Sequence, residues 1–349
     1  MRIILSATLL LLITSCKQKE TVFVPRDIAN VEIESILEDS LLSIRAIDIL
    51  NDGNLAFAAN NNSFGLYDLV KKSWTISKQK QDSLKFSFRA VGHTSTDFFM
   101  LTIGNPALLY KTTNSGMQLV YKEEHDKVFY DSMNFWNDNE GIAMGDPTDD
   151  CISIVITRDG GNTWTKLSCY VLPQALEGEA AFAASDTNIA IIGDHTWIAT
   201  GGNASRVLYS SNKGETWEVY DTPIMQGTGT TGMYSIDFYD ELNGFAIGGD
   251  YTKPEDNSAN KIRTTDGGKT WKVVGANNEP DYRSCLQYLP NREGQELVVV
   301  GFNGIDYSKD AGSTWTHLSD EGFYTIRFVD EHTAYAAGNG RISKLTFRE

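Results

Sequence analysis

The chain repeats one eight-residue turn four times. The copies read TRDGGNTW at 157–164, SSNKGETW at 210–217, TTDGGKTW at 264–271 and SKDAGSTW at 308–315, and a degenerate fifth copy, TTNSGMQL, lies at 112–119. Their shared form is Ser/Thr-x-Asp/Asn-x-Gly-x-x-Trp. Regular repetition of one supersecondary unit predicts a repeat architecture for the whole chain.

Each shared position of this turn has a physical role. We expect the Asp or Asn to accept backbone N–H bonds and so build the turn. The Gly two positions later supplies the positive φ that a tight hairpin needs, and the Trp packs its large face between neighbouring units. Structural roles are therefore predicted for Asp159 and Trp164, Asn212 and Trp217, Asp266 and Trp271, and Asp310 and Trp315.

The turns belong to longer units of four strands. Upstream of each turn stand an apolar strand, a second turn and a small-residue strand ending in Gly, as in IDFYDELNGFAIGGD at 236–250. Short apolar runs separated by turns indicate strands rather than helices. The sequence thus predicts an all-β fold, a seven-bladed β-propeller of four-stranded antiparallel blades. The units lie near 43–75, 86–122, 129–169, 179–220, 232–275, 282–318 and 322–349.

The two ends of the repeat array complement each other. The last unit stops after its third strand, whereas residues 21–36 precede the first unit with no partner. We expect this N-terminal strand to complete the last blade and close the ring, which leaves only short, protected sheet edges. Residues 22–349 would then form a single domain.

The first residues have the pattern of an export signal. A basic start, Met1-Arg2, precedes an apolar run from Ile3 to Ile13 that is too short to span a bilayer, and Cys16 follows. Residues 1–15 are predicted to be a lipoprotein signal peptide, with Cys16 lipidated and 16–21 forming a tether. An ordinary signal peptide with an incidental cysteine is the alternative. The expected location is the bacterial cell envelope, on the periplasmic or cell-surface side.

The net charge of the chain limits the classes of partner that it can bind, and the spacing of two cysteines indicates that they lie close together. A formal net charge of -16 argues against nucleic acid and against an anionic membrane surface as partners. The lipid anchor is then the expected membrane attachment, and we expect a monomer. Cys151 and Cys169 are equally far from Gly160, so they should face each other across one hairpin, either as a disulfide or as two buried thiols.

The repeat resembles the Asp-box, or bacterial neuraminidase, repeat. Over nearly the whole mature chain the sequence also resembles exported bacterial propellers related to the photosystem II stability/assembly factor. Five strings carry this resemblance: GIAMGDP (141–147), GEAAFAAS (178–185), WIATGG (197–202), GGDYTKP (248–254) and YRSC (282–285). The resemblance implies a single propeller but says little about activity, because sialidases, receptors and assembly factors all carry Asp-boxes.

One residue per blade is expected at the mouth of the central funnel. Aligning the innermost strands gives Arg45, Arg89, Asp131, Glu179, Tyr234, Arg283 and Tyr324, with Asp250 and Tyr251 added from loops on the same face. Guanidinium groups suit carboxylate, sulfate or phosphate. The sequence therefore predicts a binding or assembly module whose ligand is an anionic group on a protein or a glycan. A polar lining in which these charges merely neutralise one another is the alternative.

The same ring contains the residue types of sialidase-like glycoside hydrolysis. That chemistry would use Asp131, Glu179 and Tyr234. Sialidases, however, have six blades and a Phe-Arg-Ile-Pro motif, whereas SIRAI (43–47) and SFRAV (87–91) here lack the proline. The five histidines show no metal-ligand spacing, and no residues suit a flavin, nicotinamide or haem, so neither metal nor cofactor is expected.

Overall fold

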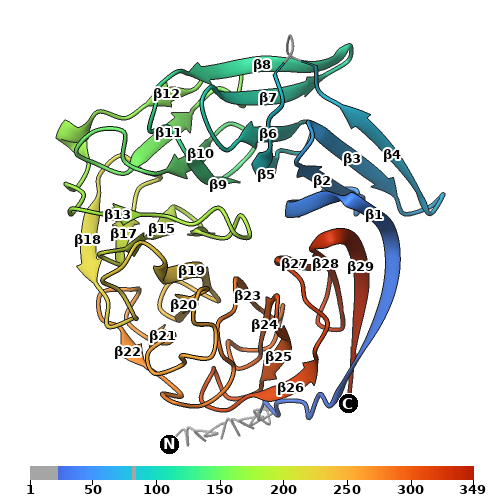
Figure 1. Cartoon of the computed structure of the whole chain (residues 1–349), viewed down its shortest axis with the longest axis vertical. Helices are drawn as coiled ribbons and strands as arrows, with labels where there is room; N and C mark the ends of the chain where they lie inside the picture. The colour runs from blue at the N-terminus through green and yellow to red at the C-terminus, as the bar shows by residue number, and fades with distance from the viewer. Residues whose placement is uncertain (1–22, 81–83) are drawn as a thin grey trace, which may run out of the picture.

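The computed structural model describes residues 23–80 and 84–349, and it confirms the all-β propeller (Figure 1). The predicted signal peptide, Cys16 and the tether lie outside these residues. Within the described ranges the one helix is a 3₁₀ turn, η1 (Cys169–Val171). No helix there is long and apolar enough to cross a membrane.

Antiparallel pairing divides the described strands into seven four-stranded blades. Blades 1 to 3, from the centre outward, contain β1 (Asn30–Ile49), β2 (Leu55–Ala59), β3 (Ser63–Asp68) and β4 (Ser73–Lys78); β5 (Phe88–His93), β6 (Phe98–Thr102), β7 (Ala107–Thr113) and β8 (Gly116–Glu123); and β9 (Tyr130–Phe135), β10 (Gly141–Gly145), β11 (Ser153–Thr157) and β12 (Thr165–Lys166).

Blade 4 differs from the others by an added pair of short strands. It contains β14 (Ile189–Ile192), β15 (His195–Ala199), β17 (Arg206–Ser210) and β18 (Glu218–Asp221), whereas β13 (Glu179–Ala180) pairs with β16 (Gly201–Gly202), which reaches β19 of blade 5. Blades 5 to 7 contain β19 (Thr231–Phe238), β20 (Gly244–Asp250), β21 (Lys261–Thr264) and β22 (Lys272–Val273); β23 (Cys285–Tyr288), β24 (Leu297–Gly301), β25 (Gly304–Ser308) and β26 (Thr316–Ser319); and β27 (Thr325–Phe328), β28 (Thr333–Ala337) and β29 (Asn339–Arg348).

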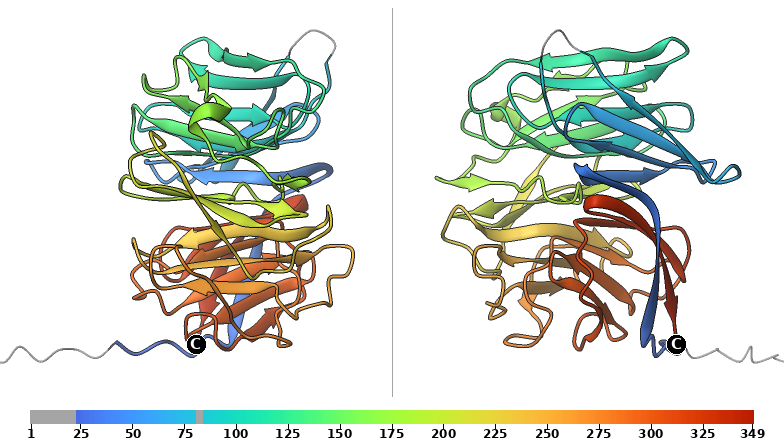
Figure 2. Two further views of the ribbon diagram at one scale, coloured as in Figure 1. Left: turned by 90° about the vertical axis from the view of Figure 1, so that its left-hand side faces the viewer. Right: turned by 45° about the vertical axis from the view of Figure 1, so that its right-hand side comes forward.

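The long strand β1 closes the ring, as the sequence predicts. Its first half pairs with β29, from Asn30 opposite Arg348 to Ser35 opposite Ser343, and so forms the outermost strand of blade 7. Its second half, from Ile44, pairs with β2 as the innermost strand of blade 1. The right-hand view of Figure 2 shows β1 (blue) running beside β29 (red) before it enters the ring.

The blades are held together by apolar layers between them. The innermost strands contact their neighbours in order, and β27 contacts β1. One buried cluster combines Phe99 of β6 with Met133 and Trp164 of blade 3, and another joins Trp197 of β15 to Ile236 of β19. Each of these cores lies between two neighbouring blades and is formed by the facing sides of both.

The four repeated turns share one hydrogen-bond pattern. In each, the side-chain oxygen of the Asp or Asn accepts the backbone N–H four residues later at 2.8–2.9 Å. The hydroxyl of the first Ser or Thr accepts the N–H of the Gly at 2.8–3.0 Å. These contacts agree with the expected turn-building role.

The Gly of the turn has two reasons to be glycine. Gly161 has φ 73°, and a Cβ there would stand 2.2 Å from the ring of Phe99 in the preceding blade. Gly312 (φ 83°) would meet Phe245 at 2.1 Å in the same way. The Gly of each of these turns thus packs against a side chain of the preceding blade, a contact that we call the hook. A side chain at the Gly position would push the two blades apart.

Cys151 and Cys169 form a disulfide with a Cα–Cα distance of 5.4 Å. The bond is not between paired strands, however. Cys151 precedes β11, whereas Cys169 begins η1, after β12 has ended. It therefore ties the start of one strand to the loop that leaves the blade, and Cys285 is the free, buried cysteine of the described chain.

Candidate functional site

The centre of the ring is crossed by a segment of blade 4, residues 181–188, which we call the channel segment. In Figure 1 this yellow-green chain leaves β13 and reaches into the middle of the ring. Ser185 Oγ donates to the Ser284 carbonyl of blade 6 at 2.7 Å, and Thr325 Oγ1 of blade 7 donates to the Ser185 carbonyl at 2.9 Å. The Ile236 N–H of blade 5 donates to the Thr187 carbonyl at 2.9 Å.

Asp186 fixes the same segment to blades 2 and 3. Its carboxyl oxygens accept the backbone N–H groups of Val91 and Met133 at 2.9 and 3.0 Å. Burial raises the pKa of Asp186 to about 8, although Arg327 and these two N–H donors act in the opposite direction. Asp186 has φ 58°, a conformation that Asp adopts more readily than most residues.

Arg45 and Arg89 bind the channel segment through its backbone. Arg89 Nη1 donates to the Ala183 carbonyl at 2.9 Å, and Arg45 Nη1 donates to the Ala184 carbonyl at 3.2 Å. Burial lowers the pKa of Arg45, and burial together with the charge of Arg45 lowers the pKa of Arg89 to about 10. Both groups are cationic at neutral pH. Among the described residues, no carboxylate oxygen lies within 4.0 Å of either guanidinium, which leaves their charge without a close counterion.

A group of aromatic side chains lies beside Arg45. The guanidinium of Arg45 lies 3.8 Å from the ring centre of Tyr324, a cation–π contact. Tyr234 stacks on Phe182 at 3.9 Å and meets Tyr282 edge-on at 4.9 Å. Tyr251 and Phe302 extend this group outward, and both are exposed (49% and 42%). We call this set the mouth collar: Arg45, Arg89, Phe182, Tyr234, Tyr251, Tyr282, Phe302 and Tyr324.

Asp131 is the buried carboxyl of the same ring. Both of its oxygens are buried without a hydrogen-bond partner among the described residues. Burial and the nearby Asp146 raise the pKa of Asp131 well above its usual value, against the effect of Arg89. Burial also raises the pKa of Asp146 to about 6. Burial thus favours the neutral form of Asp131, which weakens it as a counterion for Arg89.

The structure places four residues of the predicted funnel ring at equivalent positions on their innermost strands. Strand β1 has a register shift around Arg45, and the same irregularity recurs at Arg89, Asp131 and Tyr234. These residues occupy equivalent places on the innermost strands. Tyr324 directly precedes β27 and packs on Arg45, so it belongs to the same level.

Arg283 and Glu179 do not stand where the alignment placed them. Arg283 is one residue out of register, and its side chain is buried against Asp306 in a 2.7 Å ion pair within blade 6. Glu179 lies in β13 rather than on the innermost strand, because the channel segment takes that place in blade 4. Its carboxylate is fully buried and pairs with Arg206. Both residues hold their own blades together.

The remaining predicted residues have local structural contacts. Asp250 accepts the N–H and hydroxyl of Thr252 at 2.9 and 2.7 Å and so builds a turn. Tyr234 Oη donates to the Thr230 carbonyl at 2.8 Å. Since Glu179 is bound to Arg206, the described contacts contain no Tyr234–Glu179 pair of the kind that would activate a tyrosine nucleophile.

The channel segment is not among the features that the sequence predicts. The alignment of innermost strands places Glu179 on that strand in blade 4, whereas the structure has the channel segment in its place. The available signal was the polar run Ser185-Asp186-Thr187-Asn188, which interrupts the apolar pattern that an innermost strand should have. The contacts with six other blades depend on the closed ring, so local pattern could not reveal them.

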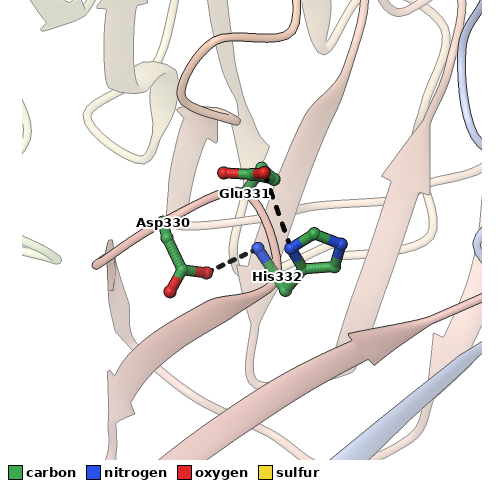
Figure 3. A group of neighbouring side chains, drawn as sticks. All are labelled: Asp330, Glu331 and His332. Atoms are coloured by element: carbon green, nitrogen blue, oxygen red, sulfur yellow. Dashed lines mark hydrogen bonds and ion pairs between the residues drawn. The ribbon is translucent and has the colours of Figure 1, made fainter.

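A cluster of possible metal ligands lies away from the mouth collar, in the turn after β27 (Figure 3). The ligand atoms of Asp330, Glu331 and His332 lie within 4.8 Å of one another. Asp330 already accepts the backbone N–H groups of His332 and Thr333 at 2.8 Å. These contacts identify a turn-building role for Asp330.

Comparisons with known proteins bear on the fold. No family model matches the chain, and no curated protein matches it. A solved structure entitled "YCF48 bound to D1 peptide" is similar, with a TM-score of 0.67 and 13% identity over 94% of this chain and 98% of that one. YCF48 from Cyanidioschyzon merolae (TM-score 0.63, 11% identity, 92% and 99% covered) and the RRP9 WD40 repeats (0.62, 11%, 93% and 99%) are also similar. At these identities the comparisons establish a shared propeller fold.

Proposed function

We propose that this protein is a binding propeller for a segment of a partner protein, which docks on the mouth collar. The observation that carries the proposal is the pair of guanidinium groups, Arg45 and Arg89, with no close carboxylate among the described residues and with the ring of Tyr324 packed on Arg45. Aromatic and arginine side chains are enriched at protein interfaces and among their energetic hot spots. The similar structure entitled "YCF48 bound to D1 peptide" adds support, since it is a propeller that binds a peptide.

The chemistry of the collar favours a peptide with a carboxylate. Arg89 uses Nη1 for Ala183, so its other N–H groups can face a ligand. Exposed rings of Tyr251 and Phe302 offer flat apolar surfaces for neighbouring side chains. A carboxylate between Arg45 and Arg89 would relieve their mutual repulsion. A glycan carrying a carboxylate or sulfate would use the same two charges but fewer of the rings.

The test compares two peptides that differ in one group. A fluorescent hexapeptide with a free C-terminal carboxylate is titrated against the protein, and the same peptide with an amidated C-terminus is the control. We expect the free acid to bind about tenfold more tightly, the scale of one charge-assisted hydrogen bond. Arg89→Gln should remove this preference, whereas Arg348→Gln, an exposed arginine at the end of β29, should keep it.

The alternative outcomes separate the ligand classes. Equal binding of acid and amide, or a preference that persists in Arg89→Gln, would contradict the anion site. Thermal stabilisation by sialic acid or uronic acids, with no effect of peptides, would assign the collar to glycans. Turnover of chromogenic glycosides is not expected, because Glu179 and Tyr234 are bound to other groups.

We also propose that the propeller is held at the bacterial cell envelope by a lipid on Cys16. The support is the sequence pattern of residues 1–16. Cys16→Ser should release the protein from membranes, since a lipid chain is the proposed anchor. Sedimentation of the variant with membranes after a salt wash would contradict this anchor.

A further inference from the structure

Blade 2 lacks the hook that four other blades carry. Its degenerate turn is a two-residue hairpin in which Thr113 pairs with Gly116, and Leu119 stands where the repeat has Trp. A Cβ at Gly116 would meet nothing within 4 Å, whereas the Gly of each intact turn abuts a side chain of the preceding blade. The Gly of the degenerate turn therefore makes no such contact with blade 1, and Met117 of this turn packs against the apolar cluster that the two blades share.

Blade 1 shows a matching change. The first residue pair after the register shift in β1 joins Ala46 to Ala58, and the third joins Asp48 to Ala56. The residues at the same place in blades 2 and 5 are Phe99 and Phe245, the rings against which Gly161 and Gly312 pack. In blade 1, which precedes the blade without a hook, the methyl group of Ala56 stands at this place instead of a ring.

The two changes leave a groove of about 520 Å³ between blades 1 and 2. Its lining includes Ala56, Phe64, Leu66, Thr96, Phe98 and Thr112. Leu66 is 40% exposed, so the groove opens to solvent. It lies beside the loop after β1, at the opposite end of that inner strand from Arg45, and is thus separate from the mouth collar.

The rim of the groove is acidic. Asp52 and Asp97 lie on it, and an adjoining hollow that shares Asn51, Thr94 and Ser95 adds Asp48 and Asp138. The basic groups nearby are Lys111, 3.4 Å from Asp97, and His93, which hydrogen-bonds Asp48. Four carboxylates against these two groups leave a negative rim, which favours a cationic partner.

We propose that this groove binds an aromatic side chain of a partner protein flanked by Lys or Arg, so that the partner supplies the hook that blade 2 lacks. The kind of side chain that we expect in the groove is inferred from the blades with an intact repeated turn. In blade 5, Trp271 fills the equivalent space between blades and its indole N–H donates to the Gly268 carbonyl at 2.9 Å. An indole from outside would contact the apolar side chains of Ala56, Phe64 and Phe98, and its basic neighbours would meet the acidic rim.

The test uses two indoles of opposite charge. Tryptamine carries an ammonium group and indole-3-propionate a carboxylate. We expect tryptamine to shift the amide NMR signals of Ala56, Phe64 and Thr96 in the full chain. Indole-3-propionate should bind several-fold more weakly because of the rim charge. A peptide copying residues 262–273 should produce the same shifts as tryptamine, and its Trp→Ala version should not.

Two variants close the groove in different ways. Ala56→Phe restores the ring found in blades 2 and 5 and should weaken tryptamine binding about tenfold. Leu66→Lys alters only the exposed wall, so it remains informative if the first variant folds poorly. Unchanged binding in both variants, equal binding of the two indoles, or shifts confined to other surfaces would overturn the proposal. Self-association that Ala56→Phe abolishes would assign the groove to a second copy of the chain and also overturn it.

Discussion

At the scale of single residues, the ion pair of Glu179 and Arg206 decides between a catalytic and a structural role. The Glu179 carboxylate is fully buried and receives Arg206 Nε at 3.1 Å, Arg206 Nη2 at 2.5 Å and Thr200 Oγ1 at 2.7 Å. Its acceptor positions are thus occupied by the protein itself. A buried charge that is paired in this way stabilises the fold only while both partners remain.

Glu179→Ala should therefore destabilise the protein by about 3–5 kcal/mol, because it leaves Arg206 buried without a counterion. Urea unfolding measures the change. The control is Glu32→Ala, which breaks the exposed pair with Arg348 and should have little effect. Unchanged stability in Glu179→Ala would contradict the structural assignment and restore Glu179 as a candidate catalytic group.

Buried carboxyls make stability depend on pH. Burial raises the pKa of Asp131 well above its usual value and that of Asp186 to about 8. The folded protein then binds more protons than the unfolded chain between about pH 4 and 8, so stability falls as pH rises through this range. We expect the melting temperature to fall from pH 5 to pH 9. Asp131→Asn should flatten the fall, and an equally steep curve would show that Asp131 is already ionised.

Residue-level register was the limit of prediction from sequence. Aligning the innermost strands places Arg45, Arg89 and Asp131 at equivalent positions, and the structure has them there. In blade 6 the alignment is one residue out of register and places Arg283 in the funnel, although its side chain turns to Asp306. Because side chains alternate between faces, a slip of one position moves a residue to the other side of a strand.

At the scale of elements, the repeated turns were predictable because their chemistry is local. The Asp, the Gly and the first hydroxyl interact within eight residues, so the sequence contains nearly all the information. The channel segment was not predictable in this way. Its hydrogen-bond partners include Ser284 and Thr325, which are about a hundred or more positions away in the sequence.

Within one repeated turn, the contributions of the Trp and the Asp to the free energy of unfolding can be compared. Trp271 is 7% exposed and lies in the core between blades 4 and 5, so Trp271→Ala should cost about 3–5 kcal/mol. Asp266→Ala removes hydrogen bonds to Thr270 and Thr264 that are worth about 1 kcal/mol each and should cost less. Chemical unfolding ranks the two variants.

Neither variant should change peptide binding at the mouth collar while the protein stays folded, since the turns lie at the outer ends of the blades. Binding that is lost in a folded Asp266→Ala protein would place the functional surface on the side of the turns. The reverse ranking of stabilities would mean that the turn hydrogen bonds, rather than the Trp, hold neighbouring blades together.

At the scale of the whole molecule, one strand and one segment unify the ring. Strand β1 belongs to blades 7 and 1, and the channel segment of blade 4 bonds to the other six blades. A propeller without these two links would be an array of blades that contact only their neighbours. With them, the ends of the array and its centre are tied together, and we expect one cooperative unfolding transition.

This expectation is tested by removing the closing strand. A chain that begins at Leu42 keeps the half of β1 that pairs with β2, but β29 then becomes an exposed edge strand. Phe347 and Leu345 of β29, which are buried in the intact ring, would lose the strand that pairs with them. Exposed edges pair with other chains. We expect a lower melting temperature, a broader transition and concentration-dependent association by light scattering. A chain that begins at Phe23 is the control and should behave as one sharp transition, because it retains β1. If the shortened chain melted as sharply and as high as this control, blade 7 would be stable with three strands, and the closing strand would not be what makes the ring a single unit.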